Sequence, residues 1–191
     1  MSAPPLDRRV RKTRRQLRDS LVSLILARGW DEVSVLDVCA HADVGRSTFY
    51  LHFADKEDLL LSGFDELHEA LHTAGAQAVG TFAFVRPLFE HVKENGRLMR
   101  AVAGRKSGQV VQRRFRDVVK QLVDAELVTL GIGAEVRHHT ARYLGGALVE
   151  LMLGWLETPR GMDAESLSRL FMRLTEGVVS GARAVSRGSG S

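Results

Sequence analysis

Residues 29–60 read GWDEVSVLDVCAHADVGRSTFYLHFADKEDLL, and their pattern predicts two short helices separated by a tight turn. Ser34 is a typical helix N-cap, and we expect it to begin a short helix over residues 35–42. The turn residues at 43–45 then separate that helix from a second one, expected over residues 46–53. Two short helices joined by a three-residue turn have the geometry of a helix-turn-helix, whose second helix enters a groove of DNA.

The segments on either side of this stretch also read as helices. Upstream, residues 8–27 form the expected first helix, and Gly29 provides the left-handed stop that ends many helices. Its apolar face consists of Leu17, Leu21, Leu24 and Ile25, which recur at helical spacing. Downstream, Asp55 is expected to cap a fourth helix, with Asp58 three residues later in the manner of a capping box.

The chain begins with a strongly basic arm. Residues 1–18 contain seven Arg and Lys side chains and one Asp, a local charge of +6 in a chain whose net charge is +4. Such a segment is either the solvated start of a helix or an arm that faces DNA phosphates. The neighbouring helix-turn-helix favours the second interpretation.

Composition limits the class of protein. Apolar residues make up 45% of the 191 residues, enough for a core, and the single cysteine excludes an intrachain disulfide. No uncharged apolar run approaches the ~18 residues of a membrane span, and the basic start lacks the apolar stretch of a signal peptide. We therefore expect a soluble cytoplasmic protein with no membrane contact. Residues 186–191, rich in Ser and Gly, are expected to form a flexible tail.

The exposed positions of the second short helix carry side chains suited to DNA. These positions are Arg46, Ser47, Thr48, Tyr50 and His52. Arginine reaches guanine or phosphate, hydroxyls donate to phosphate, and Tyr and His present polar tips on flat bodies. Phe49 and Phe53, four residues apart, are expected to face inward. Lys56 lies in the first turn of the fourth helix, where backbone N–H groups already favour a phosphate.

The same stretch resembles the DNA-binding domain of TetR/AcrR regulators over about residues 9–60. The residues that carry the resemblance are Gly29-Trp30, Ser34-Val35, Asp37-Val38-Cys39, Asp43-Val44-Gly45, Thr48-Phe49-Tyr50, His52-Phe53 and Lys56-Glu57-Asp58-Leu59. The resemblance implies a set of residues that contact double-stranded DNA. This set is Ser34, Arg46, Ser47, Thr48, Tyr50, His52 and Lys56.

Three residues depart from the family's pattern. Asp43 stands where Gly is usual, and Asp tolerates a left-handed turn better than most residues. Gly45 stands where Ser is common, so one cap hydroxyl is lost. Cys39 replaces a frequent Ala and is expected as a small buried hydrophobe, with a redox-sensing thiol as the alternative.

The rest of the chain also reads as helix, because nothing alternates with period two for long. We expect an all-α protein of about nine helices. Its expected domains are a helix-turn-helix DNA-binding domain over residues 1–56 and a helical effector-binding and dimerisation domain over residues 57–185. The clearest later helix is expected over residues 134–157.

Residues 143–157 predict a dimer, because only Glu150 and Glu157 are charged in this stretch. A helix that is apolar nearly all round is buried on more than one side, and one side is expected to face a second chain. The expected interface residues are Leu144, Leu148, Leu151, Met152, Trp155, Leu170 and Leu174. The resemblance likewise implies a homodimer through the last two helices, on a near-palindromic operator. The alternative is a core helix within one chain.

The resemblance also implies a cavity for an unidentified small-molecule effector in the C-terminal half. Candidate lining residues are Phe82, Phe84, Phe89, Met99, Phe115, Val119 and Tyr143. Ordinary core packing is the alternative for each of them. The order of Trp155, Gly161-Met162 and a final helix is similar to that of the dihydroxyacetone-kinase regulator group, and this similarity names no ligand.

Other patterns are weaker. Residues 93–120 carry nine basic and two acidic side chains, for which a solvated face is the preferred interpretation and an anionic effector or further DNA contact the alternative. The pairs His68/His72 and His138-His139 lack a third ligand at clear spacing, so neither a metal nor a cofactor is expected.

The functional expectation is a sequence-specific, ligand-responsive DNA-binding regulator, most simply a repressor. The sequence has no Gly-rich phosphate loop, metal-ligand cluster or nucleophile elbow, so we expect no catalytic residue and no enzyme. The alternative is a helical protein-interaction module that has lost specific DNA binding. The basic arm argues against that alternative.

Overall fold

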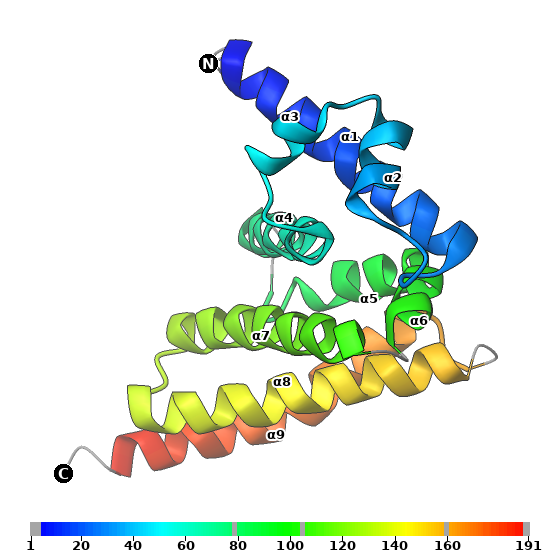
Figure 1. The fold of residues 1–191 in the computed structure, drawn as a ribbon. Coiled ribbons are helices and arrows are strands. Elements are labelled where there is room, and N and C mark those ends of the chain that lie inside the picture. The colour runs from blue at the N-terminus through cyan, green and yellow to red at the C-terminus, as the bar shows by residue number, and fades with distance from the viewer. Residues whose placement is uncertain (1–4, 78–79, 104–105, 159–160, 189–191) are drawn as a thin grey trace. The chain divides into compact units, whose positions relative to one another are not determined.

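The computed structural model describes residues 5–77, 80–103, 106–158 and 161–188. Within these ranges the chain forms nine helices and no strand (Figure 1). They are α1 (Pro5–Arg28), α2 (Val35–Ala42), α3 (Arg46–Tyr50), α4 (Lys56–Gln77), α5 (Val85–Glu94), α6 (Gly96–Ala103), α7 (Lys106–Thr129), α8 (Ala134–Glu157) and α9 (Ala164–Gly188). The expected all-α class is therefore confirmed. None of the described helices is both long enough and apolar enough to cross a membrane.

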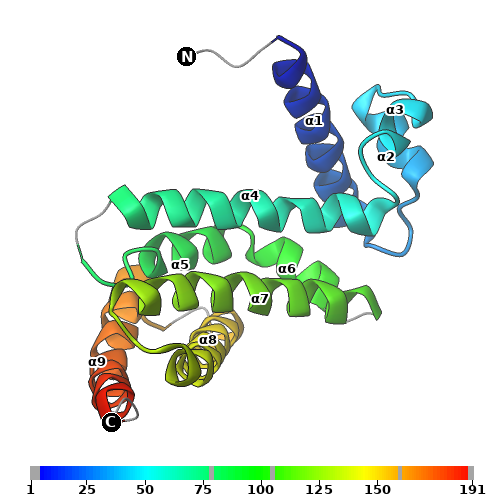
Figure 2. The ribbon, with the colours of Figure 1, turned by 90° about the vertical axis from the view of Figure 1, so that its left-hand side faces the viewer.

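The helices belong to two compact units. The first unit contains residues 1–66 and 97–111, and the second contains residues 67–96 and 112–191. α4 is one unbroken helix (Figure 2), and its residues are shared between the two units. The expected domains, residues 1–56 and 57–185, follow the sequence motif and stay a prediction.

α1 begins at Pro5, ahead of the expected start at Arg8. Proline is well tolerated in the first turn of a helix, because an N–H there has no partner within the helix. The helix ends at Gly29, whose φ of 85° lies in the left-handed region and whose N–H donates to the carbonyl oxygen of Ile25 at 2.8 Å. Leu17, Leu21 and Ile25 are fully buried, as their spacing predicts.

α2 is fixed by its two ends. At its start, the Ser34 hydroxyl accepts a hydrogen bond from the Asp37 N–H at 3.2 Å, and the Asp37 carboxylate accepts one from the Ser34 N–H at 2.8 Å. This is a capping box, and it confirms Ser34 as the N-cap. At its end, Asp43 has φ 52° and ψ 46°, so Asp does adopt the left-handed conformation that the family's Gly would take.

α3 is shorter than the expected helix over residues 46–53. It covers Arg46–Tyr50, after which the N–H groups of His52 and Phe53 both donate to the carbonyl oxygen of Phe49, at 2.9 and 3.0 Å. This sharing tightens the last turn and ends the regular helix. Gly45 is the N-cap, and it makes no side-chain hydrogen bond, as expected from the loss of the hydroxyl.

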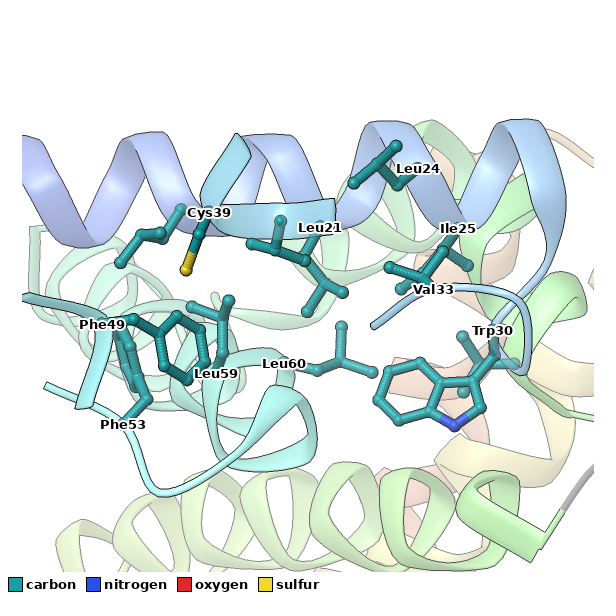
Figure 3. Packing of buried hydrophobic residues seen from close by; sticks show 13 residues of the cluster. Leu21, Leu24, Ile25, Trp30, Val33, Cys39, Phe49, Phe53, Leu59 and Leu60 are labelled. Atoms are coloured by element: carbon teal, nitrogen blue, oxygen red, sulfur yellow. The ribbon is translucent and has the colours of Figure 1, made fainter. Parts of the chain in front are cut away.

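The core of the first unit holds these short helices in place (Figure 3). Phe49 and Phe53 are buried, as predicted, and Figure 3 shows them beside Leu59 at the start of α4. The buried members of the cluster are Leu17, Leu21, Leu24, Ile25, Trp30, Val33, Val38, Cys39, Phe49, Phe53, Leu59, Leu60 and Val102. Val102 belongs to α6, so the core draws on a segment distant in sequence, which local patterns did not predict.

In the second unit, α8 and α9 lie side by side and run in opposite directions, and α5 packs against both (Figure 1). α8 begins and ends where the sequence predicts. A Cβ added to Gly145 would lie 3.4 Å from the Cα of Lys120, so the missing side chain lets α7 and α8 approach closely.

The end of α9 is tied to the loop between α7 and α8. The Ser186 hydroxyl accepts a hydrogen bond from the Gly133 N–H at 2.8 Å, and the Arg183 Nε donates to the Leu130 carbonyl at 3.3 Å. α9 therefore continues to Gly188, and the expectation of a flexible tail from residue 186 is wrong for its first three residues. Residues 189–191 lie outside the described ranges.

Candidate nucleic-acid interface

α3 presents a polar face to solvent and an apolar face to the core. Arg46 and Ser47 are exposed, and Tyr50 is 53% exposed, whereas Phe49 between them is fully buried. Thr48 is half-buried. The expected DNA-facing residues of this helix are therefore brought together on one short, rigid element.

The aromatic side chains of this segment support one another. The rings of Phe49 and Tyr50 meet edge to face with their centroids 5.3 Å apart. His52 is half-buried, and its ring lies 6.3 Å from that of Phe53. Tyr50 is therefore anchored on a buried ring while its polar tip remains accessible, an arrangement suited to contact with a phosphate or a base edge.

The basic arm of α1 contacts the segment that follows α3. The Arg14 guanidinium lies 5.1 Å from the centre of the Phe53 ring, so α1 contacts the segment that follows α3. The arm's exposed cations are Arg8, Arg9, Arg11, Lys12 and Arg15. A cationic helix beside a helix-turn-helix is an arrangement that binds the DNA backbone.

Comparisons with known proteins agree with this geometry. The family model described as "Bacterial regulatory proteins, tetR family" matches residues 17–62, and the model "Transcriptional regulator C-terminal region" matches residues 81–177. The second match alone covers half of the chain. The chain belongs to the TetR family.

Relatives of this TetR-family protein are also regulators. The HTH-type transcriptional regulator TcmR of Streptomyces glaucescens is 28% identical over 162 residues, which are 85% of this chain and 55% of TcmR. The chain thus spans about half the length of TcmR. As a member of this family, the chain is a transcriptional regulator with a DNA-binding domain.

Solved structures show that the fold is shared. The dihydroxyacetone kinase operon activator DhaS aligns with a TM-score of 0.70 and 18% identity, over 88% of this chain and 96% of that one. A TetR transcriptional regulator from Streptococcus agalactiae 2603V aligns with a TM-score of 0.63 and 23% identity, over 88% and 96% of the two chains. The fatty acid degradation regulator FadR from Bacillus halodurans gives 0.62 and 20%, over 91% and 96%.

Two of the expected DNA-binding residues of this TetR-family regulator are used inside the domain. The single hydroxyl hydrogen of Ser34 is donated to the Asp37 carboxylate, so it is not available to a phosphate. The Lys56 ammonium donates to the carbonyl oxygens of Trp30 and Val33. Both residues thus hold the backbone that presents α2 and α3, and their expected contact with DNA stays a prediction.

Sequence reasoning missed Leu51 and Leu36. Leu51 caps the end of α3 and is 80% exposed, and Leu36 in the first turn of α2 is 60% exposed. Both lie in the helix-turn-helix of this TetR-family regulator, where the thymine methyl group is the apolar feature of the major groove. In the sequence, the sign of such a contact is an apolar residue, Leu51, that follows the polar residues of α3.

Cys39 is a packing residue. Its side chain is buried in the core of the first unit, and burial raises the pKa of the thiol above its ordinary value, an effect that the charge of Arg46 only partly opposes. A neutral, buried thiol reacts slowly with oxidants. The geometry therefore supports the small-hydrophobe interpretation over a redox sensor.

The expected effector-pocket residues do not form one group. Phe82, Phe84, Phe89, Phe115 and Val119 are buried in the second unit. Tyr143 is 64% exposed, and Met99 belongs to the first unit, so the structure does not group these two with the others, and the pocket stays a prediction. Tyr143 faces outward because the opposite side of α8 carries the residues that pack inward.

The buried aromatic residues of the second unit contact one another. The ring of Phe82 lies 6.3 Å from that of Phe171, and the ring of Phe89 lies 5.6 Å from that of Trp155. The Trp155 indole N–H donates to the Met162 carbonyl at 2.7 Å. These contacts join α5 to α8 and the turn before α5 to α9, as a packed core does.

The expected dimer-interface residues also divide. Leu144, Leu148 and Met152 are at most 2% exposed within a single chain, so placing them in a dimer interface is wrong. Leu151, Trp155 and Leu170 are half-buried, and Leu174 is 66% exposed. When a helix is apolar on nearly every side, its sequence does not distinguish the face that packs inside the chain from the face that is exposed.

The exposed face of α8 and α9 carries small residues instead. Gly146 and Gly154 on α8 and Gly177 and Gly181 on α9 are exposed, and a Cβ added to any of them would meet nothing within 4 Å. Leu174 lies one turn before Gly177 on α9. Together they form a surface against which other helices could pack closely.

Metal-binding patterns gain no support. Among the described residues, no three His, Cys, Asp or Glu side chains are grouped to hold an ion. His68 and His72 stack with their ring centroids 6.2 Å apart, and His138 and His139 meet edge to face at 5.3 Å. These are ring contacts between neighbours on one helix.

Proposed function

We propose that this chain is a ligand-responsive repressor that binds a near-palindromic operator as a homodimer. The observation that carries the proposal is the capped helix-turn-helix, whose α3 buries Phe49 and exposes Arg46, Ser47 and Tyr50 beside a basic α1. Such a regulator acts where bacterial DNA lies, so we place it in the cytoplasm.

The DNA contacts divide by chemistry. Arg46 is the best candidate for recognising guanine, because its guanidinium can donate two hydrogen bonds to the two acceptors of that base, O6 and N7. Ser47, Thr48, Tyr50 and His52 supply donors for phosphates or base edges. The exposed cations of α1 supply charge that binds every sequence equally.

A two-fold dimer is supported by the exposed surface of α8 and α9. Leu174 is a large apolar side chain that a single chain leaves 66% exposed. The exposed glycines leave room for the helices of a second copy. A dimer of this kind presents two recognition helices to half-sites about 34 Å apart, one turn of DNA.

A response to an effector requires a link between the unit that binds the effector and the helix-turn-helix that binds DNA. The second unit carries the buried aromatic residues that an apolar effector would contact, and α4 has residues in both units. An effector that favours a different position of α4 would favour a state that does not fit the operator.

Selection from a pool of random duplexes tests the proposal. Wild-type protein should enrich a two-fold symmetric motif with half-sites about 10 base pairs apart. Arg46→Gln should lose or relax one position of the motif, while Arg113→Gln, which removes an exposed cation of the second unit, should enrich the same motif as wild type. Enrichment of no motif by the wild-type protein would favour the interaction-module alternative.

A further inference from the structure

Lys56 opens α4, and its side chain reaches back to the loop between α1 and α2. Its Nζ donates to the carbonyl oxygen of Trp30 at 2.8 Å and to that of Val33 at 2.5 Å. The same nitrogen lies 4.6 Å from the centre of the Trp30 ring. Two of the three N–H groups of the ammonium are therefore used by carbonyl oxygens, and the cation rests on an aromatic face.

The surroundings of the ammonium are poorly suited to a phosphate. Burial lowers the pKa of Lys56 below its ordinary value, and three nearby carboxylates partly oppose this shift. The carboxylates belong to Asp31, Asp37 and Glu57. A phosphate that approached the ammonium would meet their repulsion and would have to compete with two backbone carbonyls.

We propose that Lys56 is a positioning residue, whose ammonium fixes the α1–α2 loop and does not itself bind a DNA phosphate. The loop is held from both sides, because the side chains of Trp30 and Val33 are buried in the core while Lys56 binds their carbonyl oxygens. Val33 directly precedes Ser34, the N-cap of α2. The ammonium therefore sets where the helix-turn-helix begins.

The consequence for DNA binding is indirect. Side chains that contact a ligand depend on a supporting shell that holds their backbone to within about 0.5 Å. Without the ammonium, the loop loses two hydrogen bonds from a charged donor, and the start of α2 is held less firmly. The affinity for the operator then falls, although no contact with DNA has been removed.

The salt dependence of DNA binding separates the two roles. Each phosphate contact contributes about 0.9 to the slope of log K against log salt concentration. Lys56→Met should weaken binding to the selected operator about tenfold at every salt concentration and leave the slope unchanged. Arg15→Met, which removes an exposed cation of α1, is the matched reference and should reduce the slope by about 0.9.

Two measurements without DNA test the same claim. Lys56→Met should lower Tm by about 4–8 °C, since hydrogen bonds of a charged group are lost. In a Trp155→Phe background, which leaves Trp30 as the single tryptophan, the variant should also shift the emission of Trp30. Lys56→Gln keeps a hydrogen-bond donor and should give smaller changes of both kinds, which provides a second variant if Lys56→Met does not fold.

The salt dependence and the two measurements without DNA can also overturn the proposal. A slope reduced by about 0.9, with Tm and Trp30 emission unchanged, would show that Lys56 binds a phosphate and would overturn the proposal. The slope measurement rests on the proposed function. If the wild-type protein binds no selected duplex, the proposed function fails, and Tm and Trp30 emission still decide whether Lys56 holds the loop.

Discussion

The guanidinium of Arg18 on α1 and the carboxylate of Glu66 on α4 form an ion pair of 2.6 Å within the first unit. The Arg18 side chain is 14% exposed, whereas that of Glu66 is 61% exposed. Arg18 Nη1 is buried and has no hydrogen-bond partner among the described residues. Glu66 therefore compensates a largely buried cation that is only partly satisfied.

This pair predicts unequal effects of removing its two members. Glu66→Gln leaves the buried cation without its counterion and should lower the free energy of unfolding by about 1–2 kcal/mol, a modest loss because solvent screens the exposed carboxylate. Arg18→Met also removes the unpaired N–H groups and should cost less, about 1 kcal/mol or below. Urea unfolding measures both, and a larger loss for Arg18→Met would contradict this reading of the pair.

Tyr50→Ala should weaken operator binding about 10–100-fold, the range of one good contact to DNA. The side chain is half exposed, so the variant should keep the Tm and the dimer of the wild type. Fluorescence anisotropy measures the affinity, and Leu26→Ala, an exposed position on α1, is the control. Equal affinities for Tyr50→Ala and wild type would remove Tyr50 from the interface.

Gly45→Ser should stabilise the protein by about 0.5 kcal/mol. Gly45 is the N-cap of α3 with φ −64° and ψ 145°, a conformation that Ser adopts, and an added Cβ would make ordinary contacts of 3.9 Å with the hydroxyls of Ser47 and Thr48. The new hydroxyl supplies the missing cap and reduces the freedom of the unfolded chain. Thermal unfolding detects the gain, and a lower Tm would show strain at the cap.

Leu174→Arg should separate the dimer into monomers, because it places a charge on the exposed face of α9. Sedimentation at several protein concentrations measures the dissociation. Leu26→Arg changes an exposed leucine of the first unit in the same way and should leave the dimer intact. A Leu174→Arg variant that remains dimeric would place the interface elsewhere.

His91 predicts a loss of stability in mild acid. Burial lowers its pKa below the ordinary value of 6.5, an effect that the charge of Glu94 partly opposes. Below about pH 6.5 the unfolded chain therefore binds a proton more readily than the folded one, and stability falls from pH 6.5 toward the folded-state pKa, by at most about 1.4 kcal/mol per pH unit. Above pH 6.5 the contribution is complete.

Measuring Tm as a function of pH tests whether His91 lowers stability in mild acid. Between about pH 7.5 and pH 5, the curve of His91→Gln should be flatter than that of the wild type, because the titrating group is gone. The carboxylates of Asp37 and Asp163, whose pKa values are lowered from 3.8, act below this window. A His91→Gln curve parallel to that of the wild type would assign the acid sensitivity to other groups.

Features set by close neighbours in sequence could be predicted. The Ser34 cap, the left-handed Asp43 and the inward Phe49 each depend on residues within one helical turn. Features set by distant partners could not. Lys56 reaches carbonyls 26 and 23 residues earlier in the chain, and no local pattern distinguishes that role from a phosphate contact.

The C-terminal half shows the same limit for burial. Leu144, Leu148 and Met152 face inward and Gly146 and Gly154 face outward, although α8 is apolar on nearly every side. Which face of such a helix packs inside the chain depends on α5, α7 and α9. The exposed face that we propose for the dimer therefore becomes visible only once those helices are placed.

The most direct test of sequence-specific regulation is a titration of the protein into a labelled operator duplex from the selection, with excess competitor DNA. A sequence-specific dimer should bind tightly, resist the competitor and saturate at two protomers per duplex. Loss of one of the two symmetric half-sites should reduce the affinity about 100-fold or more. Binding that the competitor removes, and that disappears as salt is raised, would show only attraction to phosphates and would contradict sequence-specific regulation.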